Sequence, residues 1–180
     1  MRFFHFSLTN YLFIHQNFPG QFPHVARALA ARGDTVVALG ESKSMAARMP
    51  VHARVIHLGY PQPKGASGQT HHYLRGLEAH VRRGQLVFRT LTKLASEGFR
   101  PDVIVAHPGW GEALFLKDVF AKARHIQYLE FFYRAEGADV GFDPEFPVSA
   151  DDTARVRVKN ATQLISFEAA DGGISPTAWQ

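Results

Sequence analysis

The stretch Pro101–Glu112, PDVIVAHPGWGE, contains the pattern that decides the fold. Its first part, Pro101–His107, is a short apolar run rich in β-branched residues and reads as a buried strand that begins at a proline. The run ends at His107, and the glycines that follow form a tight turn into a helix expected over Glu112–Phe120. A strand, a tight turn and a helix in this order make half of a βαβ unit.

The same alternation extends outward in both directions from this unit. We expect further strands over Tyr11–His15, Thr35–Leu39, Arg54–Leu58 and His125–Phe131, and a strand or turn from Ile174. Helices are expected over Gln21–Arg32, over His71–Ser96, and from Asp151 or Asp152 to about Ala170, with Gly33, Gly98 and Gly172 as stop signals. Regular strand–helix alternation predicts a doubly wound α/β fold, in which helices cover both faces of a parallel sheet.

Two helices carry apolar residues at helical spacing, which predicts the faces that they bury. On the first helix, Val25 and Leu29 fall on one face. On the long helix the predicted buried stripe is Leu74, Leu77, Val81, Phe88, Leu91 and Ala95.

Length and composition bound the class of protein. The 180 residues fit one domain, with residues 11–180 as a Rossmann-like unit and residues 1–10 as a leader or an extra strand. The net charge of +4 permits an anionic ligand or membrane surface without requiring one, and no nucleic-acid partner is expected. The chain has no cysteine, which suits a reducing cytoplasm, and no apolar run of membrane-spanning length.

Parallel α/β sheets bind ligands beyond the carboxyl ends of their strands, so the candidate residues are sought there. The first such segment, His15–Phe22, has neither a dinucleotide fingerprint nor a P-loop. Asn17, Gly20 and Gln21 are its candidate binding residues, because Gly20 permits close backbone approach at a helix N-terminus. The alternative is a plain tight turn.

The second candidate segment is the turn after the strand at Pro101–His107. His107 is the candidate catalytic residue, because imidazole is suited to proton transfer near neutral pH. Gly109 keeps the backbone open, and Trp110 presents a ring on which a sugar can stack. The alternative is a structural histidine that caps the turn, with Trp110 in the core.

The third segment follows the strand at His125–Phe131. Glu130 and Arg134 are candidates for binding acceptor hydroxyls or a charged group. The nearby acidic residues lack the spacing of a calcium loop, and the histidines lack the spacing of a zinc site, so no metal is expected. No serine-hydrolase motif occurs. The basic residues Arg75, Arg82, Arg89 and Lys93 recur along one helix, either as a solvated face or as a contact with anionic lipid.

Four stretches together resemble the N-terminal domain of bacterial family-4 glycosyltransferases: FIHQNFPGQF (Phe13–Phe22), DVIVAHPGWGEALFLKD (Asp102–Asp118), FYRAEGADVGFDPEFP (Phe132–Pro147) and AADGGISPTAWQ (Ala169–Gln180). The resemblance implies a GT-B architecture, in which this domain binds the acceptor and a C-terminal domain binds the nucleotide-sugar. It also implies a retaining mechanism without metal or cofactor, with Gly20 near the donor phosphates and His107 near the reacting sugar.

The expected function is therefore the acceptor-binding half of a glycosyltransferase that acts on a glycan, lipid or small molecule. The nucleotide-sugar would reach it through a C-terminal domain not contained in this sequence, and residues 1–180 alone are expected to be inactive. A cytoplasmic, membrane-peripheral location is expected. Exposed apolar groups such as Phe18 and Trp110 are expected to face the absent domain and favour self-association. The alternative is a stand-alone sugar- or partner-binding module without catalysis.

Overall fold

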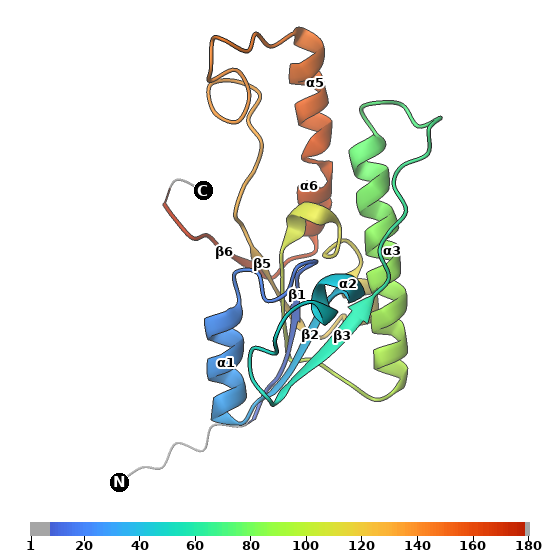
Figure 1. Cartoon of the computed structure of the whole chain (residues 1–180), viewed down its shortest axis with the longest axis vertical. Coiled ribbons are helices and arrows are strands. Elements are labelled where there is room, and N and C mark those ends of the chain that lie inside the picture. The colour runs from blue at the N-terminus through green and yellow to red at the C-terminus, as the bar shows by residue number, and fades with distance from the viewer. Residues whose placement is uncertain (1–7, 179–180) are drawn as a thin grey trace.

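The computed structural model describes residues 8–178, which form one parallel sheet with helices on both faces (Figure 1). Within these residues the sheet has six strands in the order β3-β2-β1-β4-β5-β6, all neighbours being parallel. This is the strand order of the doubly wound dinucleotide-binding fold, so the predicted fold class is confirmed. The strands are β1 (Asn10–Ile14), β2 (Thr35–Glu41), β3 (Val55–Tyr60), β4 (Val103–Ala106), β5 (Arg124–Tyr128) and β6 (Gly172–Ile174).

The helices connect these strands and extend beyond the sheet at one end. They are α1 (Pro23–Arg32), α2 (Ser42–Ala46), α3 (Arg75–Ser96), α4 (Leu116–Val119), α5 (Ala150–Lys159) and α6 (Ala161–Glu168), with a 3₁₀ turn η1 (Pro108–Trp110) after β4. Helix α1 lies on one side of the sheet and α3 on the other (Figure 1). The N-terminal part of α3 and the whole of α5 rise above the carboxyl ends of the strands.

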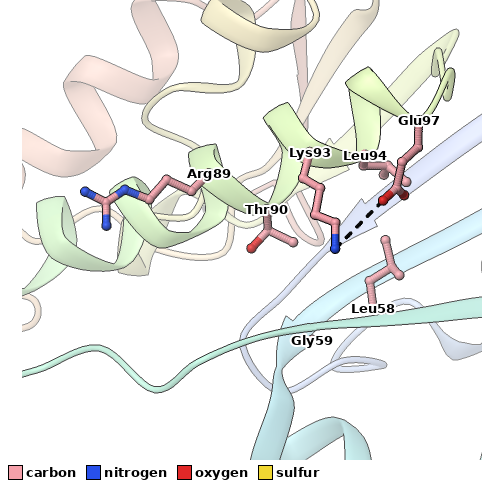
Figure 2. Close-up of a pocket in the computed structure, with 7 residues that line it drawn as sticks. All are labelled: Leu58, Gly59, Arg89, Thr90, Lys93, Leu94 and Glu97. Atoms are coloured by element: carbon pink, nitrogen blue, oxygen red, sulfur yellow. Dashed lines mark ion pairs between the residues drawn. The ribbon is translucent and has the colours of Figure 1, made fainter.

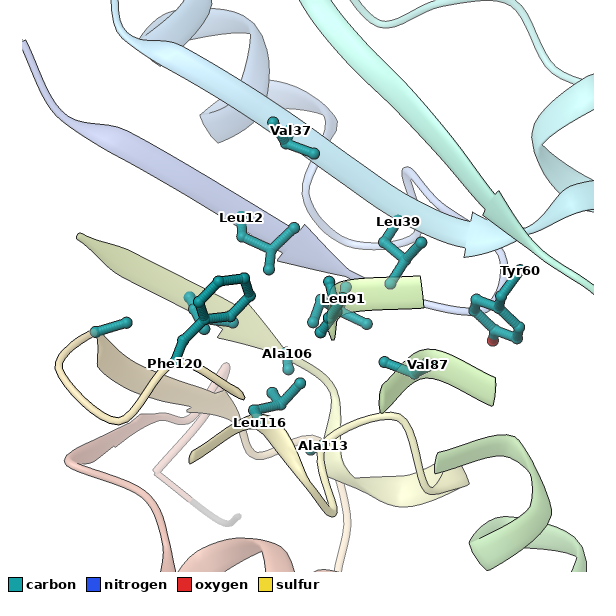
Figure 3. Close-up of a cluster of buried hydrophobic side chains, with 13 residues drawn as sticks. Leu12, Val37, Leu39, Tyr60, Val87, Leu91, Ala106, Ala113, Leu116 and Phe120 are labelled. Carbon is teal, nitrogen blue, oxygen red and sulfur yellow. The ribbon is translucent and has the colours of Figure 1, made fainter. Parts of the chain in front are cut away.

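The two faces of the sheet form two separate hydrophobic clusters. Alternate residues of the central strands, such as Leu12 and Ala106, point toward Val87 and Leu91 of α3 (Figure 3). The residues between them, such as Phe13, point toward Ala26 and Ala30 of α1. Because both faces are buried, the strands read in the sequence as continuous apolar runs rather than alternating ones.

The strand predictions were correct in number and differ at their ends. Strands β2 and β3 each run two residues further than predicted, to Glu41 and Tyr60. Strand β5 ends at Tyr128, three residues before the predicted Phe131. Asn10, which was expected to belong to a leader or an extra strand, belongs to β1 and pairs with Thr35. Residues 1–7 of the expected leader lie outside the described residues.

The buried face of α3 differs from the predicted stripe. Leu91 is buried as predicted, but Leu74, Val81 and Phe88 are exposed, whereas Gly84 and Val87 are buried. The helix is therefore rotated so that a glycine faces the core, and glycine contributes nothing to a hydrophobic pattern. On α1 the prediction for Val25 was wrong in the same way, because Val25 is exposed while Ala26 and Ala30 are buried.

All four predicted helices differ from the structure in their bounds, and α3 begins at Arg75 rather than His71. Helix α1 begins at Pro23 rather than Gln21, because proline suits the first helical position. The helix expected over Glu112–Phe120 is replaced by η1 and the short α4. The helix expected to start at Asp151 or Asp152 is capped by Ser149, with Asp152 completing a capping box, and Asn160 divides it into α5 and α6.

A close backbone approach holds η1 against α3. Gly111 follows η1 with a φ of 100°, and a Cβ added there would lie 2.1 Å from the carbonyl oxygen of His80. A Cβ on Gly84 would lie 2.7 Å from the carbonyl oxygen of Gly111. Only two glycines facing each other permit this approach, which explains why Gly84 is on the buried face of α3.

This contact can be tested with a matched pair of glycines. Gly98 has nearly the same φ as Gly111, 97°, but a Cβ there meets nothing within 4 Å. We expect Gly98→Ala to cost only the left-handed strain, about 1–2 kcal/mol. Gly111→Ala adds a backbone clash and should cost about 3 kcal/mol or more, measured as the free energy of unfolding in urea. Equal losses for the two variants would contradict the close approach.

Candidate active site

The candidate site lies where the chain crosses from one half of the sheet to the other. Strands β1 and β4 are neighbours at the centre of the sheet, and their connections leave toward opposite faces. His15 directly follows β1 and His107 directly follows β4. The rings of these histidines meet edge to face with centroids 5.7 Å apart. This topological switch point is the ligand-binding crevice of doubly wound sheets.

His107 is held in one orientation by both ring nitrogens. Its Nδ1 accepts a hydrogen bond from the Gly109 N–H at 3.1 Å, and its Nε2 lies 3.1 Å from Glu130 Oε2. Because Nδ1 is an acceptor, we assign the ring proton to Nε2, which donates it to the carboxylate. Burial lowers the pKa of His107 although Glu130 opposes this shift, so the ring is neutral at neutral pH.

Glu130 joins three of the predicted residues into one network. Its Oε2 accepts from His107 and also from Gln21 Nε2 at 2.9 Å. The three residues come from the segments that follow β4, β5 and β1, which the parallel sheet brings to one edge. The side chain of Glu130 is 40% exposed, so a ligand can reach the carboxylate that His107 orients.

Aromatic rings form a wall around His107. Trp110 is half-buried and stacks on the imidazole with an interplanar angle of 16°, and Phe131 contacts both rings. A Cβ on Gly109 would lie 2.7 Å from Phe131, so the glycine is needed for this packing. One face of Trp110 is thus occupied by His107, and stacking of a sugar on its other surface stays a prediction.

Gly20, in the loop after β1, allows the His15 ring to pack against the backbone of this loop. Gly20 has a φ of 47°, and a Cβ there would lie 2.9 Å from three atoms of the His15 ring. The His15 Nδ1 accepts from the Asn17 N–H, and burial lowers the pKa of His15 to about 4, with the neighbouring His107 adding to the effect. Gly20 was predicted to lie at the N-terminus of a helix. This prediction is wrong, because α1 begins only at Pro23.

Asn17 and Arg134 are not part of the His107 network. The side-chain oxygen of Asn17 accepts a hydrogen bond from Ser44 Oγ at 2.9 Å, and its backbone carbonyl accepts one from the Arg48 guanidinium. Arg134 is exposed in the loop after β5, where its backbone N–H donates to Asp139. Within residues 8–178, no hydrogen bond or ion pair joins the Arg134 guanidinium to His107. Binding of a ligand by either residue stays a prediction.

A second polar cluster on the α3 side of the sheet was missed in the sequence. Tyr60 ends β3 and donates to Glu112 Oε1 at 3.2 Å. Arg83 of α3 forms an ion pair with Glu41, which ends β2, and donates to the carbonyl oxygen of Trp110 at 2.9 Å. Glu41 and Tyr60 sit at strand ends, but the predicted strands stopped two residues short of both. Longer strand predictions would have found them.

Glu112 is the most deeply buried acid of this cluster, with a relative exposure of 1%. Burial raises its pKa to about 7, and Arg83 offsets only part of this shift. Within the described residues, Glu112 Oε2 and Arg83 Nε have no hydrogen-bond partner. The cluster therefore combines a carboxyl that titrates near neutral pH with a guanidinium that fixes η1.

One expectation about the surface is wrong. Phe18 was expected to be exposed, but it is 1% exposed and packs in the core beneath α1, because the chain turns back at His15 and directs the ring inward. The exposed phenylalanines among the described residues are instead Phe88 on α3 and three in the segment after β5: Phe132, Phe142 and Phe146. Within residues 8–178 there is no helix long and apolar enough to cross a membrane.

The basic residues of α3 are partly neutralised by acids of the same helix or its end. Arg82 pairs with Glu78, and Lys93 lies 3.8 Å from Glu97, one turn further along the helix. Lys93 and Glu97 both line a groove of about 390 Å³ between α3 and the end of β3 (Figure 2). Arg89 lines the same groove and has no such pair within the described residues. Among those residues, no group of three or more histidine, aspartate or glutamate side chains is arranged to hold a metal ion.

The strand order defines a Rossmann-like domain, the unit from which GT-B glycosyltransferases are built. Similar solved structures include Os79 from O. sativa in complex with UDP, with a TM-score of 0.58 and 13% identity over 93% of this chain and 46% of that chain. UGT89C1 from Arabidopsis thaliana in complex with UDP-L-rhamnose has a TM-score of 0.56 and 19% identity over 96% of this chain and 46% of that chain. This chain thus spans about half the length of these structures.

The family is established by a sequence profile. The model of the "Glycosyl transferase family 4 group" matches residues 32–180, and the chain belongs to this family. No curated protein is significantly similar to it in sequence. The resemblance noted in the sequence is therefore confirmed at the level of family and fold.

The buried carboxyl gives a pH dependence of stability with a definite sign. The pKa of Glu112 is about 7 in the folded chain against an ordinary value of 4.5, so its contribution to stability is full below pH 4.5 and lost as pH rises through 7. Glu112→Gln removes this loss. Measured in urea, the variant should gain on the parent between pH 4.5 and 8, by at most on the order of 3 kcal/mol. The exposed Glu136→Gln serves as control, and parallel pH profiles for parent and Glu112→Gln would contradict the assignment.

Proposed function

We propose that this chain supplies the acceptor-side half of a retaining glycosyltransferase, which moves a sugar from a nucleotide-sugar to a glycan, lipid or small-molecule acceptor. The observation that carries the proposal is the network of His107, Glu130 and Gln21 at the switch point. It is supported by the family and by the similar structures, which were solved with UDP or UDP-L-rhamnose. Donor and acceptor must be held together for transfer, so the site needs both halves.

The network suits the charge changes of glycosyl transfer. Positive charge develops on the sugar ring in the transition state, and hydrogen bonds to its hydroxyls strengthen there. In our proposal, the Glu130 carboxylate accepts hydroxyl protons of the bound sugar and its negative charge favours the transition state. The neutral His107 keeps Glu130 in place and shares its Nε2 proton with a substrate oxygen. No metal or cofactor takes part in this scheme, and the nucleotide-sugar is a substrate.

The donor half is proposed to be a second Rossmann-like unit. The similar structures are about twice as long as this chain, and the described residues form one sheet. A cytoplasmic location with peripheral membrane contact belongs to the same proposal. Its support is the absence of cysteine from the sequence and the presence on α3 of Arg89, which has no ion-pair partner among residues 8–178.

The role of His107 can be separated from its structural contribution by a second buried histidine. His125 is as deeply buried as His107, but it lies in β5 and contacts the carbonyl of Phe120. In a protein that includes the donor-binding unit, His107→Gln should lower kcat by about 10²–10³ at near-parental thermal stability. His125→Gln should lower Tm and leave kcat of the folded protein unchanged. Full activity of His107→Gln would return His107 to a structural role.

The requirement for two halves predicts the behaviour of residues 1–180 by themselves. They should give no measurable transfer from UDP-sugars, because donor and acceptor are not held at reacting distance. Activity should appear when the chain is joined to the donor-binding unit of its own gene. Robust turnover by residues 1–180 would contradict the division of the site, and a lack of any transfer by the joined protein would favour a non-catalytic binding module.

A further inference from the structure

A polar cleft of about 660 Å³ opens between the N-terminal turns of α3 and the helix α5. Its lining includes Arg75, His80, Asp151, Arg155 and Lys159. The two helices rise together above the carboxyl ends of the strands, on the same side as the switch point (Figure 1). None of His107, Glu130 and Gln21 lines this cleft.

The acids of the cleft are already engaged within the protein. Asp151 accepts from the Tyr73 hydroxyl and lies 3.5 Å from His72. Asp152 is held by the Ser149 capping box and by an ion pair with Arg155 at 2.9 Å. Neither carboxylate is therefore available as the principal partner of a bound cation.

Two cations of the cleft remain without an acidic partner among residues 8–178. The Arg75 side chain donates only to the carbonyl oxygen of Thr70. The ammonium of Lys159 lies 3.8 Å from the ring centroid of Tyr133, a cation–π contact that orients it without neutralising it. A concave site with two oriented, uncompensated cations favours an anionic ligand.

The cleft is connected to the candidate active site through aromatic contacts. His80 lines the cleft, and its ring meets Trp110 edge to face at 6.4 Å. Trp110 in turn stacks on His107. The Nδ1 of His80 is within 2.8 Å of Thr162 Oγ1 on α6, which fixes the ring between cleft and site. The cleft and the candidate active site therefore adjoin each other across a wall of packed rings.

We propose that this cleft binds the anionic group of the glycosyl acceptor, a carboxylate or phosphate carried on a sugar, through Arg75 and Lys159. The inference rests on the proposed function and names the acceptor class: a sugar acid or a sugar phosphate rather than a neutral sugar. Arg75 lies on α3 and Lys159 on α5, so each helix contributes one cation to the binding of the same anionic group.

Binding of matched sugars to the 1–180 chain tests the cleft without any donor. Glucuronate, glucose 6-phosphate and glucose are each titrated into the 1–180 chain in a calorimeter. We expect each of the two acids to bind more tightly than glucose. The double variant Arg75→Gln/Lys159→Gln should weaken binding of the preferred acid about tenfold or more and leave glucose unchanged. The control is Arg89→Gln, which removes an exposed cation of the same helix outside the cleft and should change neither.

Each outcome decides the proposal. If both acids bind no better than glucose, or if the double variant binds them as the parent does, the cleft assignment is overturned. The single variants replace the double variant if circular dichroism shows that it does not fold. Loss of acid binding in the variants supports the cleft even where the joined two-unit protein transfers no sugar, which would overturn only the proposed transferase function. Transfer with unchanged acid binding in the variants would overturn only the cleft.

Discussion

The pairing of β1 with β4 at the centre of the sheet is the constraint on which the rest of the structure depends. The His107 N–H donates to the carbonyl of Ile14, so the end of β4 is fixed against the end of β1. Because the chain leaves these two strands toward opposite faces, helices cannot cover the edge between them, and a crevice remains. The histidines that follow both strands, the loop of Gln21 and the carboxylate of Glu130 converge there for this reason alone.

Both faces of the sheet contribute to the site through the short turn η1. The turn η1 supplies the Gly109 N–H that donates to Nδ1 of His107 and the Trp110 ring that stacks on the imidazole. On the α3 side, Arg83 binds the Trp110 carbonyl, and the glycines at 84 and 111 let the two backbones touch. A movement of α3 would therefore move Trp110 and His107 together. This coupling gives the cleft above α3 a physical connection to the site.

The charges of the site are distributed in a way that suits a sugar with an acidic group. The switch point holds two neutral imidazoles and one accessible carboxylate, Glu130, which are suited to hydroxyls and to developing positive charge. The uncompensated cations Arg75 and Lys159 lie in the cleft instead. In our proposal, this separation of opposite charges would orient a ligand whose two ends differ, without neutralising the groups that hold it.

The sequence by itself determined the fold class, a doubly wound parallel sheet, and placed His107 and Glu130 at the carboxyl ends of its strands. It did so because strands and helices differ in period, and parallel strands must end at one edge. Only the tertiary structure decided which side of each helix is buried and which polar groups meet. Val81 and Phe88 fit a helical stripe with Leu91 as well as Val87 does, and the choice depends on Gly84, whose missing side chain admits the turn at Gly111. Likewise, Glu112 meets Tyr60 and Arg83 only because the sheet and α3 converge, a contact between distant segments that local periodicity does not encode.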